Sequence, residues 1–260
     1  DYPLEIEVSG PPGTRTIRAR QVVLAIPRYA LEHVVIDPRI ASADVVEQKL
    51  AQVREFPAFR LYFAYETPWW QQFCGWTDGF AVTDLPVRQT FYGAGIHGSA
   101  EDTQRLLMAS YSDYRAVEFW SGFTHVFDPP TTHLMRNSPS PTVLRDETLQ
   151  VLTGPAERQL KEMHGFLGEL PPKTWTGYAD WTPEGQGAAW HEWVAGINVL
   201  EAVKDMRHPF PDVPMYICGE AYSMTQGWVE GAVSSAELML QEQFGVEWPS
   251  WLQAGYHLGP

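Results

Sequence analysis

The sequence predicts an α+β fold, and three features of its hydrophobic pattern support that prediction. Residues 4–8 and 15–20 alternate in polarity on either side of a Gly-Pro-Pro-Gly turn, which is typical of a β-hairpin. The middle of the chain mixes short strand-like runs with longer amphipathic segments. Near the C-terminus, the apolar run Met215 to Cys218 indicates a buried strand, and helical spacing begins at Gly227.

Taken in order, the remaining elements follow from the same patterns. Strands are expected at residues 21–26, 59–65, 78–92, 105–112 and 173–181. Helices are expected at residues 31–35, 43–53, 142–152, 156–167 and 197–206. Residues 113–140 are rich in aromatics and proline, and two interpretations stay open for them, a lid or interdomain connection and a packed irregular loop.

Composition excludes several classes of protein. With 260 residues and 44% apolar content, the chain is globular and has room for one large core or two modest ones. A net charge of −14 argues against nucleic acid and anionic membranes as partners. No apolar run approaches the ~20 residues of a membrane span, so we expect a soluble protein, cytoplasmic or secreted. The opening residues read as the middle of a domain, without a signal peptide.

Metal and disulfide chemistry are not indicated. The eight histidines are scattered without the spacing of a metal site, and the two cysteines do not suggest a disulfide framework. The neighbours His191 and Glu192 are interpreted as a loop pair rather than a catalytic dyad. No nucleophile elbow or phosphate-binding loop is present.

The segment from Val213 to Leu240 carries the strongest functional signal. Gly219-Glu220 leaves a strand, a polar loop follows, and a helix opens on Gly227-Trp228. The first turn of a helix presents unpaired N–H groups and suits an anion, and Gly227 permits a close approach of the backbone. The whole run is similar to the C-terminal flavin-binding motif of the flavin amine oxidases, above all the L-amino acid oxidases and amino acid 2-monooxygenases.

The resemblance implies FAD as the cofactor and assigns residues to it. Glu220 would hold ribityl hydroxyls, Trp228 would form an aromatic wall, and the helix end at Gly227 would stabilise the reduced flavin. The Gly227 carbonyl would contact the substrate amine. The full set of implied FAD contacts is Pro27, Trp181, Gly219, Glu220, Gly227, Trp228 and Val229.

Three further segments resemble the substrate side of this family. Thr83-Asp-Leu-Pro-x-Arg88, followed by an aromatic pair, places on Tyr92 the tyrosine that binds the substrate carboxylate. Arg60 falls where the family has a lysine that holds a water near the flavin, and arginine departs from that pattern because it is not readily deprotonated. Trp181 matches the family's active-site tryptophan ahead of a glycine-rich loop. The family loop's aromatic is absent, so Trp190, His191 and Trp193 are candidates to line the pocket.

The dinucleotide-binding segment of the family is missing. Gly93-Ala-Gly-Ile-His-Gly98 has the G-x-G-x-x-G spacing, but a strand follows too soon for a helix, so we interpret it as a hairpin turn. The resemblance therefore implies the C-terminal half of a two-domain FAD amine oxidase fold, with a mixed β-sheet flanked by helices in its substrate domain. A companion chain would carry the dinucleotide fold, and an oligomer of such heterodimers is expected.

Four parts are expected along the chain, and three functions stay open. Residues 1–40 would belong to the FAD domain, 41–195 to the substrate domain, 196–245 again to the FAD domain, and 246–260 to a tail. The first function is oxidation of an L-amino acid by hydride transfer, with O2 giving H2O2. The alternatives are an amino acid 2-monooxygenase, which forms an amide, and a Trp-rich binding module without catalysis.

Overall fold

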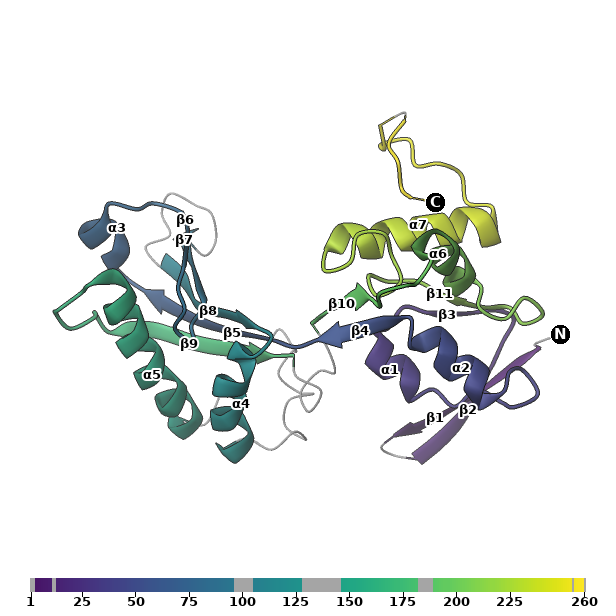
Figure 1. The fold of residues 1–260 in the computed structure, drawn as a ribbon, viewed down its shortest axis with the longest axis horizontal. Coiled ribbons are helices and arrows are strands. Elements are labelled where there is room, and N and C mark those ends of the chain that lie inside the picture. The colour runs from purple at the N-terminus through teal and green to yellow at the C-terminus, as the bar shows by residue number, and fades with distance from the viewer. Residues whose placement is uncertain are drawn as a thin grey trace. The chain divides into compact units, whose positions relative to one another are not determined.

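A computed structural model describes residues 3–10, 13–95, 105–127, 146–181, 189–253 and 255–259, which form two compact units (Figure 1). Unit 1 combines Asp1–Glu55 with Trp190–Pro260, and unit 2 is the single stretch Phe56–Ala189. The chain therefore leaves unit 1, builds unit 2 and returns. Helix α2 (Ala43–Leu50), which the sequence assigned to the substrate domain, belongs to unit 1. The assignment of FAD and substrate to the two units stays a prediction.

The strands of unit 1 agree with the sequence pattern. Strands β1 (Leu4–Gly10) and β2 (Gly13–Ala19) form the expected antiparallel hairpin. Strand β3 (Val22–Leu24) pairs in parallel with β11 (Met215–Ile217), although the two lie at opposite ends of the sequence. Most residues of β1 and β2 are exposed, whereas β11 is fully buried.

Four helices pack around this parallel pair. They are α1 (Arg28–Glu32), α2, α6 (Val199–Arg207) and α7 (Val229–Phe244). The Ser42 side chain caps α2 by accepting from the Val45 N–H. The predicted extension of this helix to residue 53 is wrong, because β4 (Val53–Phe56) begins there and pairs with β10 (Trp190–Trp193). Leu31, Leu50 and Met206 bring α1, α2 and α6 into one apolar cluster with Ile217.

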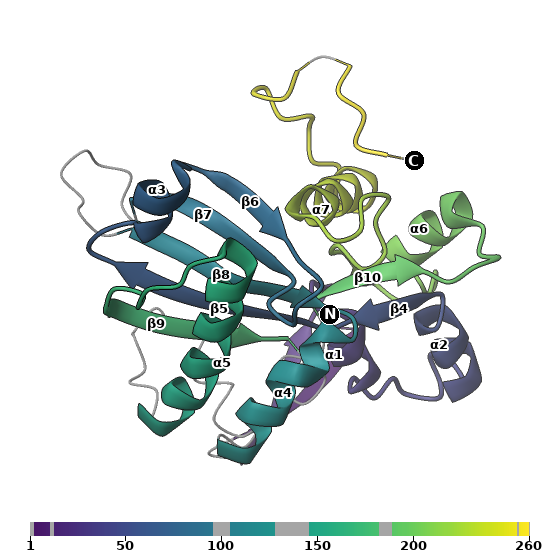
Figure 2. The ribbon, with the colours of Figure 1, turned by 60° about the vertical axis from the view of Figure 1, so that its left-hand side comes forward.

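Unit 2 is built on a five-stranded sheet in the order β6-β7-β8-β5-β9, seen from two directions in Figures 1 and 2. Its strands are β5 (Ala58–Tyr65), β6 (Gly79–Val82), β7 (Gln89–Gly95), β8 (Arg105–Asp113) and β9 (Lys173–Asp180). The sequence predicts a mixed sheet, but every pair among these strands is antiparallel. The antiparallel pairing of β7 with β8 agrees with a hairpin at residues 93–98 and excludes a dinucleotide-binding βαβ unit there; residues 96–98 lie outside the described ranges.

The helices of unit 2 pack on one face of this sheet. They are α3 (Trp69–Cys74), α4 (Ala116–Phe127) and α5 (Asp146–His164), and α4 occupies part of the stretch 113–140 whose structure the sequence left open. Strand β5 alternates, so that Phe59, Leu61, Phe63 and Tyr65 enter the core with Trp70, Trp120, Leu152 and Leu160. Arg60 and Tyr62 consequently lie on the opposite face.

Helix α5 contradicts the prediction of two helices at 142–152 and 156–167. It runs without a break through Pro155. Proline inside a helix costs about 3 kcal/mol, because it removes a hydrogen bond and crowds the preceding turn. Leu152, Ala156 and Leu160 repeat every four residues and are fully buried, and this packing offsets the penalty.

The turn at residues 83–88 is held by buried polar side chains. Its backbone closes on itself through Thr83 N–H to Arg88 O and Arg88 N–H to Leu85 O, both at 2.8 Å. Ser112 donates to Pro86 O at 2.7 Å, and the Gln159 side chain accepts from the Val87 N–H at 2.8 Å. The motif that marks the substrate side by resemblance thus forms a turn whose polar groups are paired inside the core.

Among the described residues, no helix has the length and apolar character needed to cross a membrane. Nor do three or more His, Cys, Asp or Glu side chains gather there as metal ligands.

Replacement of Gln159 by leucine should lower the free energy of unfolding by about 1–3 kcal/mol, because the Val87 N–H would stay buried without an acceptor. Arg158→Gln, an exposed change one position away on α5, should shift it by less than about 0.5 kcal/mol. Urea unfolding followed by tryptophan fluorescence compares the two variants. Equal effects would show that the Gln159 hydrogen bond contributes nothing to this turn.

Candidate functional site

Several of the residues predicted to bind FAD gather at one edge of unit 1. Because β3 and β11 are parallel, their carboxyl ends lie at the same edge, and the Cys218 N–H donates to Leu24 O at 3.3 Å. Pro27 follows β3 and begins α1, while Gly219 and Glu220 follow β11. Gly219 has φ +135°, a backbone conformation that residues with a side chain rarely adopt, and it turns the chain away from the strand. Ligands of α/β sheets bind at such an edge.

Glu220 joins the segments that meet at this edge. Its Oε1 accepts from the backbone N–H of His191 at 2.9 Å and from that of Gly227 at 2.6 Å. Its Oε2 accepts from Nδ1 of His191 at 2.7 Å. One carboxylate therefore joins β10 to the residue that precedes α7. Three protein donors therefore already occupy the Glu220 oxygens. The contact of Glu220 with the ribityl hydroxyls of FAD stays a prediction.

Strand β10 supports the loop 220–227 along its length. The Gln226 side chain accepts from the Trp193 N–H at 2.8 Å, and the Trp193 indole donates to Ser223 O at 3.1 Å. The ring of Trp190 lies over Gly227, 3.7 Å from the place where a Cβ would be. Residues 190–193 therefore form a strand and not the loop that the sequence suggested. His191 pairs with Glu220, whereas its neighbour Glu192 is close to Arg54, at 3.9 Å.

Helix α7 begins at this loop with its first turn open. Gly227 has φ +81°, and Trp228 is the N-cap but provides no side-chain cap. Trp228 and Val229 are exposed to 71% and 79%. An uncapped helix start has N–H groups to offer an anion, and the exposed indole offers a flat apolar surface beside them.

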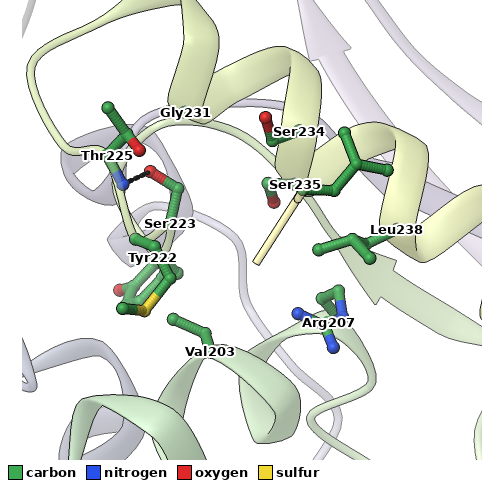
Figure 3. Close-up of a pocket in the computed structure, with 11 residues that line it drawn as sticks. Val203, Arg207, Tyr222, Ser223, Thr225, Gly231, Ser234, Ser235 and Leu238 are labelled. Atoms are coloured by element: carbon green, nitrogen blue, oxygen red, sulfur yellow. Dashed lines mark hydrogen bonds between the residues drawn. The ribbon is translucent and has the colours of Figure 1, made fainter. Parts of the chain in front are cut away.

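The opposite side of α7 is close-packed and leaves no room for a cofactor. Figure 3 shows a cavity between α6, α7 and the loop at Ser223 and Thr225, and its volume of about 10 Å³ holds roughly one water molecule. At Gly231 a Cβ would lie 2.1 Å from Thr225 O, so only glycine allows this approach of helix and loop. Arg207 beside the cavity is paired with Glu242 through two bonds of 2.8 Å.

In unit 2 the structure brings Arg60 and Trp181 together. The Arg60 guanidinium carbon lies 4.9 Å from the centroid of the Trp181 ring and 4.1 Å from that of Tyr111. Trp181 is held at the end of β9 by its N–H, which donates to Ala58 O at 2.9 Å. Sequence reasoning missed Tyr111, although alternation along β8 places it opposite Arg60. The glycine-rich loop with Gly185 and Gly187 lies outside the described residues.

Tyr92 lies on the other face of that sheet, inside the core. Its side chain is 5% exposed, and its hydroxyl is 2.5 Å from Nε2 of His164. Nδ1 of His164 is 2.6 Å from Leu160 O, which only accepts, so Nε2 is the acceptor of the Tyr92 hydroxyl. Burial lowers the pKa of His164 and raises that of Tyr92, so both groups are neutral near pH 7.

This position does not support the predicted contact of Tyr92 with a substrate carboxylate, because its hydroxyl is already bonded in the core. A shift of one residue along a strand moves a side chain to the other face. Phe91, not Tyr92, shares the face of Arg60, with its ring 5.8 Å from that of Tyr111.

Several known proteins are similar to this chain in sequence or in fold. No family model matches the chain. Aplysianin-A of Aplysia kurodai is 26% identical over 237 residues, which cover 87% of this chain and 39% of that protein. The flavin-dependent L-tryptophan oxidase RebO of Lentzea aerocolonigenes is 25% identical over 86% of this chain and 41% of its own length. The chain thus spans about two fifths of these relatives.

Solved structures show the same fold. A double mutant of putrescine oxidase superimposes with a TM-score of 0.62 and 15% identity, covering 93% of this chain and 46% of that one. The predicted α+β fold is therefore confirmed, and the match covers about half of the putrescine oxidase chain.

Removal of the Glu220 side chain should loosen β10 and the start of α7 together. Glu220→Ala leaves two backbone N–H groups without an acceptor, so we expect a loss of about 2–4 kcal/mol in the free energy of unfolding. Glu220→Gln should cost less than half of that, since its amide oxygen still accepts both N–H groups. Hydrogen exchange at His191 and Gly227 provides the local measurement. Unchanged protection of both amides in Glu220→Ala would contradict this role.

The Tyr92→Phe variant separates a core role from a ligand role. Loss of the hydrogen bond to His164 should reduce the free energy of unfolding by about 1–2 kcal/mol and leave the Michaelis constant for an amino acid unchanged. The measurements are thermal unfolding and steady-state kinetics on the same preparation. A tenfold rise in the Michaelis constant at unchanged stability would restore the carboxylate contact.

Proposed function

We propose that this chain, which is related to the flavin amine oxidases and covers about half of their fold, is part of an FAD-dependent L-amino acid oxidase. The observation that carries the proposal is the loop 220–227. It ends in an uncapped helix start with an exposed tryptophan, at the carboxyl edge of two parallel strands.

The residues at this edge fit FAD. Open N–H groups of the first turn of α7 suit the negative charge of a reduced flavin, and the indole of Trp228 suits its ring. Gly227 has φ +81°, a backbone conformation that residues with a side chain rarely adopt, and it leads the loop into the start of α7. The hydrogen bonds that Glu220 accepts from the His191 and Gly227 N–H groups hold this loop in place before any ligand binds. Less conformational entropy is therefore lost on binding.

The parallel pair β3–β11 supports the proposal of a companion part. Parallel sheets are normally buried on both faces and contain more than two strands. Here Val23 on β3 is 41% exposed, and Val233 on α7 is 52% exposed. We infer that a part of the protein with the dinucleotide-binding strand and turn completes this sheet, whether as a separate chain or as a preceding segment, and that such pairs associate further.

The reaction removes hydrogen from the α-carbon of an L-amino acid. Acceptance of a hydride, followed by two-electron reduction of O2 to H2O2 with uptake of two protons, is the chemistry that bound FAD would supply. The substrate amine loses a proton to form the imino acid, and water converts the imino acid into a 2-keto acid and ammonia. The residues of unit 1 would bind and orient the substrate: the Gly227 carbonyl would accept from the amine, and Trp228 would form an apolar wall.

An amino acid 2-monooxygenase begins with the same oxidation and differs in its product. An amine oxidase differs in its substrate, which lacks a carboxylate. Two observations distinguish these alternatives from an amino acid oxidase. They are the substrate that reduces the flavin and the product that forms.

The complete protein, purified from its source, should show flavin absorption bands that an L-amino acid bleaches without oxygen. Readmission of air should restore the bands and release H2O2, a 2-keto acid and ammonia in equal amounts. Mass spectrometry of the products distinguishes the keto acid from an amide, and denaturing electrophoresis reveals a companion chain. A colourless protein would contradict the proposal and favour a binding module.

A further inference from the structure

The start of α7 contains an acidic residue of its own. Glu230 occupies the second position of the helix, after the N-cap Trp228 and Val229. Among the described residues, the backbone N–H groups of Val229 and Glu230 have no acceptor. A carboxylate in the first turn is attracted to such N–H groups and to the positive end of the helix dipole. The Glu230 side chain therefore competes with any other anion for the helix start.

The carboxylate of Glu230 is nevertheless directed away from the helix start. Its Oε1 accepts from Oγ of Ser234, one turn further along α7, at 3.3 Å. The same oxygen accepts from the hydroxyl of Tyr256, which belongs to the segment that follows α7. Side chains of a helix lean toward its N-terminus, so a carboxylate that bonds one turn in the other direction needs partners to keep it there. Ser234 and Tyr256 are these partners.

The segment that carries Tyr256 has further contacts beside α7. It leaves the C-terminal end of the helix and then turns back toward it (Figure 1). Leu258 borders the small cavity between α6 and α7. A Cβ at Gly259 would lie 3.4 Å from Cγ of Met224, so the backbone there is close to the loop that precedes the helix. These contacts place the Tyr256 hydroxyl where it reaches Glu230.

We propose that Tyr256 is a positioning residue of the flavin site, because it holds the Glu230 carboxylate away from the start of α7. The N–H groups of that start then stay available to the flavin, whose reduced form carries negative charge. The inference rests on the proposed function, since it names a residue outside the loop 220–227 that controls the charge beside the cofactor. Both residues belong to unit 1.

Hydrogen exchange in the complete protein freed of FAD tests this position directly. Tyr256→Phe removes the hydroxyl and keeps the ring, so the packing of the segment stays. The released carboxylate should then accept from the first-turn N–H groups, and exchange of the Val229 and Glu230 amides should slow about 2- to 5-fold, the range for a charge at a helix terminus. A contact that only anchors the segment would give the opposite sign, because its loss speeds exchange.

The redox potential of the flavin-loaded protein provides the second measurement. In Tyr256→Phe, reduced FAD should bind about 2- to 5-fold more weakly relative to oxidised FAD, because the reduced form carries the charge. This ratio lowers the two-electron potential by about 9–21 mV, at 29.6 mV for a tenfold change. Glu230→Gln in the Tyr256→Phe background removes the carboxylate charge and should restore the potential. Glu230→Gln alone should change the potential less, and the double-mutant cycle measures this coupling.

Glu247→Gln is the matched control. It makes the same change of charge at an exposed position beyond the other end of α7. A helix of 16 residues is roughly 24 Å long, which exceeds the screening length of about 8–10 Å in physiological salt. Both the exchange rates and the potential should therefore stay as in the wild type.

The outcomes are distinct. Faster or unchanged exchange in Tyr256→Phe, or a lowered potential that Glu230→Gln does not restore, overturns the role of Tyr256. Bleaching of the flavin by an L-amino acid would in that case leave the proposed function intact. A protein that binds no FAD defeats the proposed function, and exchange at Val229 and Glu230 still decides whether Tyr256 holds the carboxylate away from the helix start.

Discussion

The arrangement of unit 1 depends on one carboxylate. Glu220 receives three hydrogen bonds, two from His191, which lies 29 positions before it, and one from Gly227, which lies 7 positions after it. Because all three donors converge on one side chain, the strand β10, the turn after β11 and the start of α7 are fixed relative to one another. A second connection between β10 and this loop is made by Trp193, which donates to the Gln226 side chain and to Ser223 O. The Glu220 carboxylate is largely withdrawn from water, and these donors compensate for its lost hydration.

Most elements of the fold could be predicted from local patterns. The hairpin β1–β2, the buried strand β11 and helix α7 follow from alternation, apolar runs and spacing within the sequence. Helix α5 could not, because burial of Leu152 and Leu160 overrides the effect of Pro155, and burial depends on distant segments. The strand β10 was also missed, since four residues rich in tryptophan carry no periodic signal of their own.

The candidate site was predictable in unit 1 and less so in unit 2. The glycines and Glu220 were found because each has a backbone or charge requirement visible in sequence. The pairing of Glu220 with His191 was not, since a long-range hydrogen bond leaves no local pattern. Tyr92 shows the limit most clearly, because resemblance placed an aromatic pair on a strand but only the register decides which member faces the core. Arg60 was found as a departure from a pattern, and its neighbours give that departure a physical meaning.

The insertion of unit 2 within unit 1 has a consequence for synthesis. Strand β3 leaves the ribosome roughly 190 residues before its partner β11, a delay of about 10–40 s at ~5–20 residues per second. Unit 2 is continuous and has all its strands before β11 is made. The apolar strand β3 therefore lacks β11 as a partner throughout that interval. An unpaired strand edge is a place where another chain can pair, so this interval is the time at which the folding chain is most exposed to association.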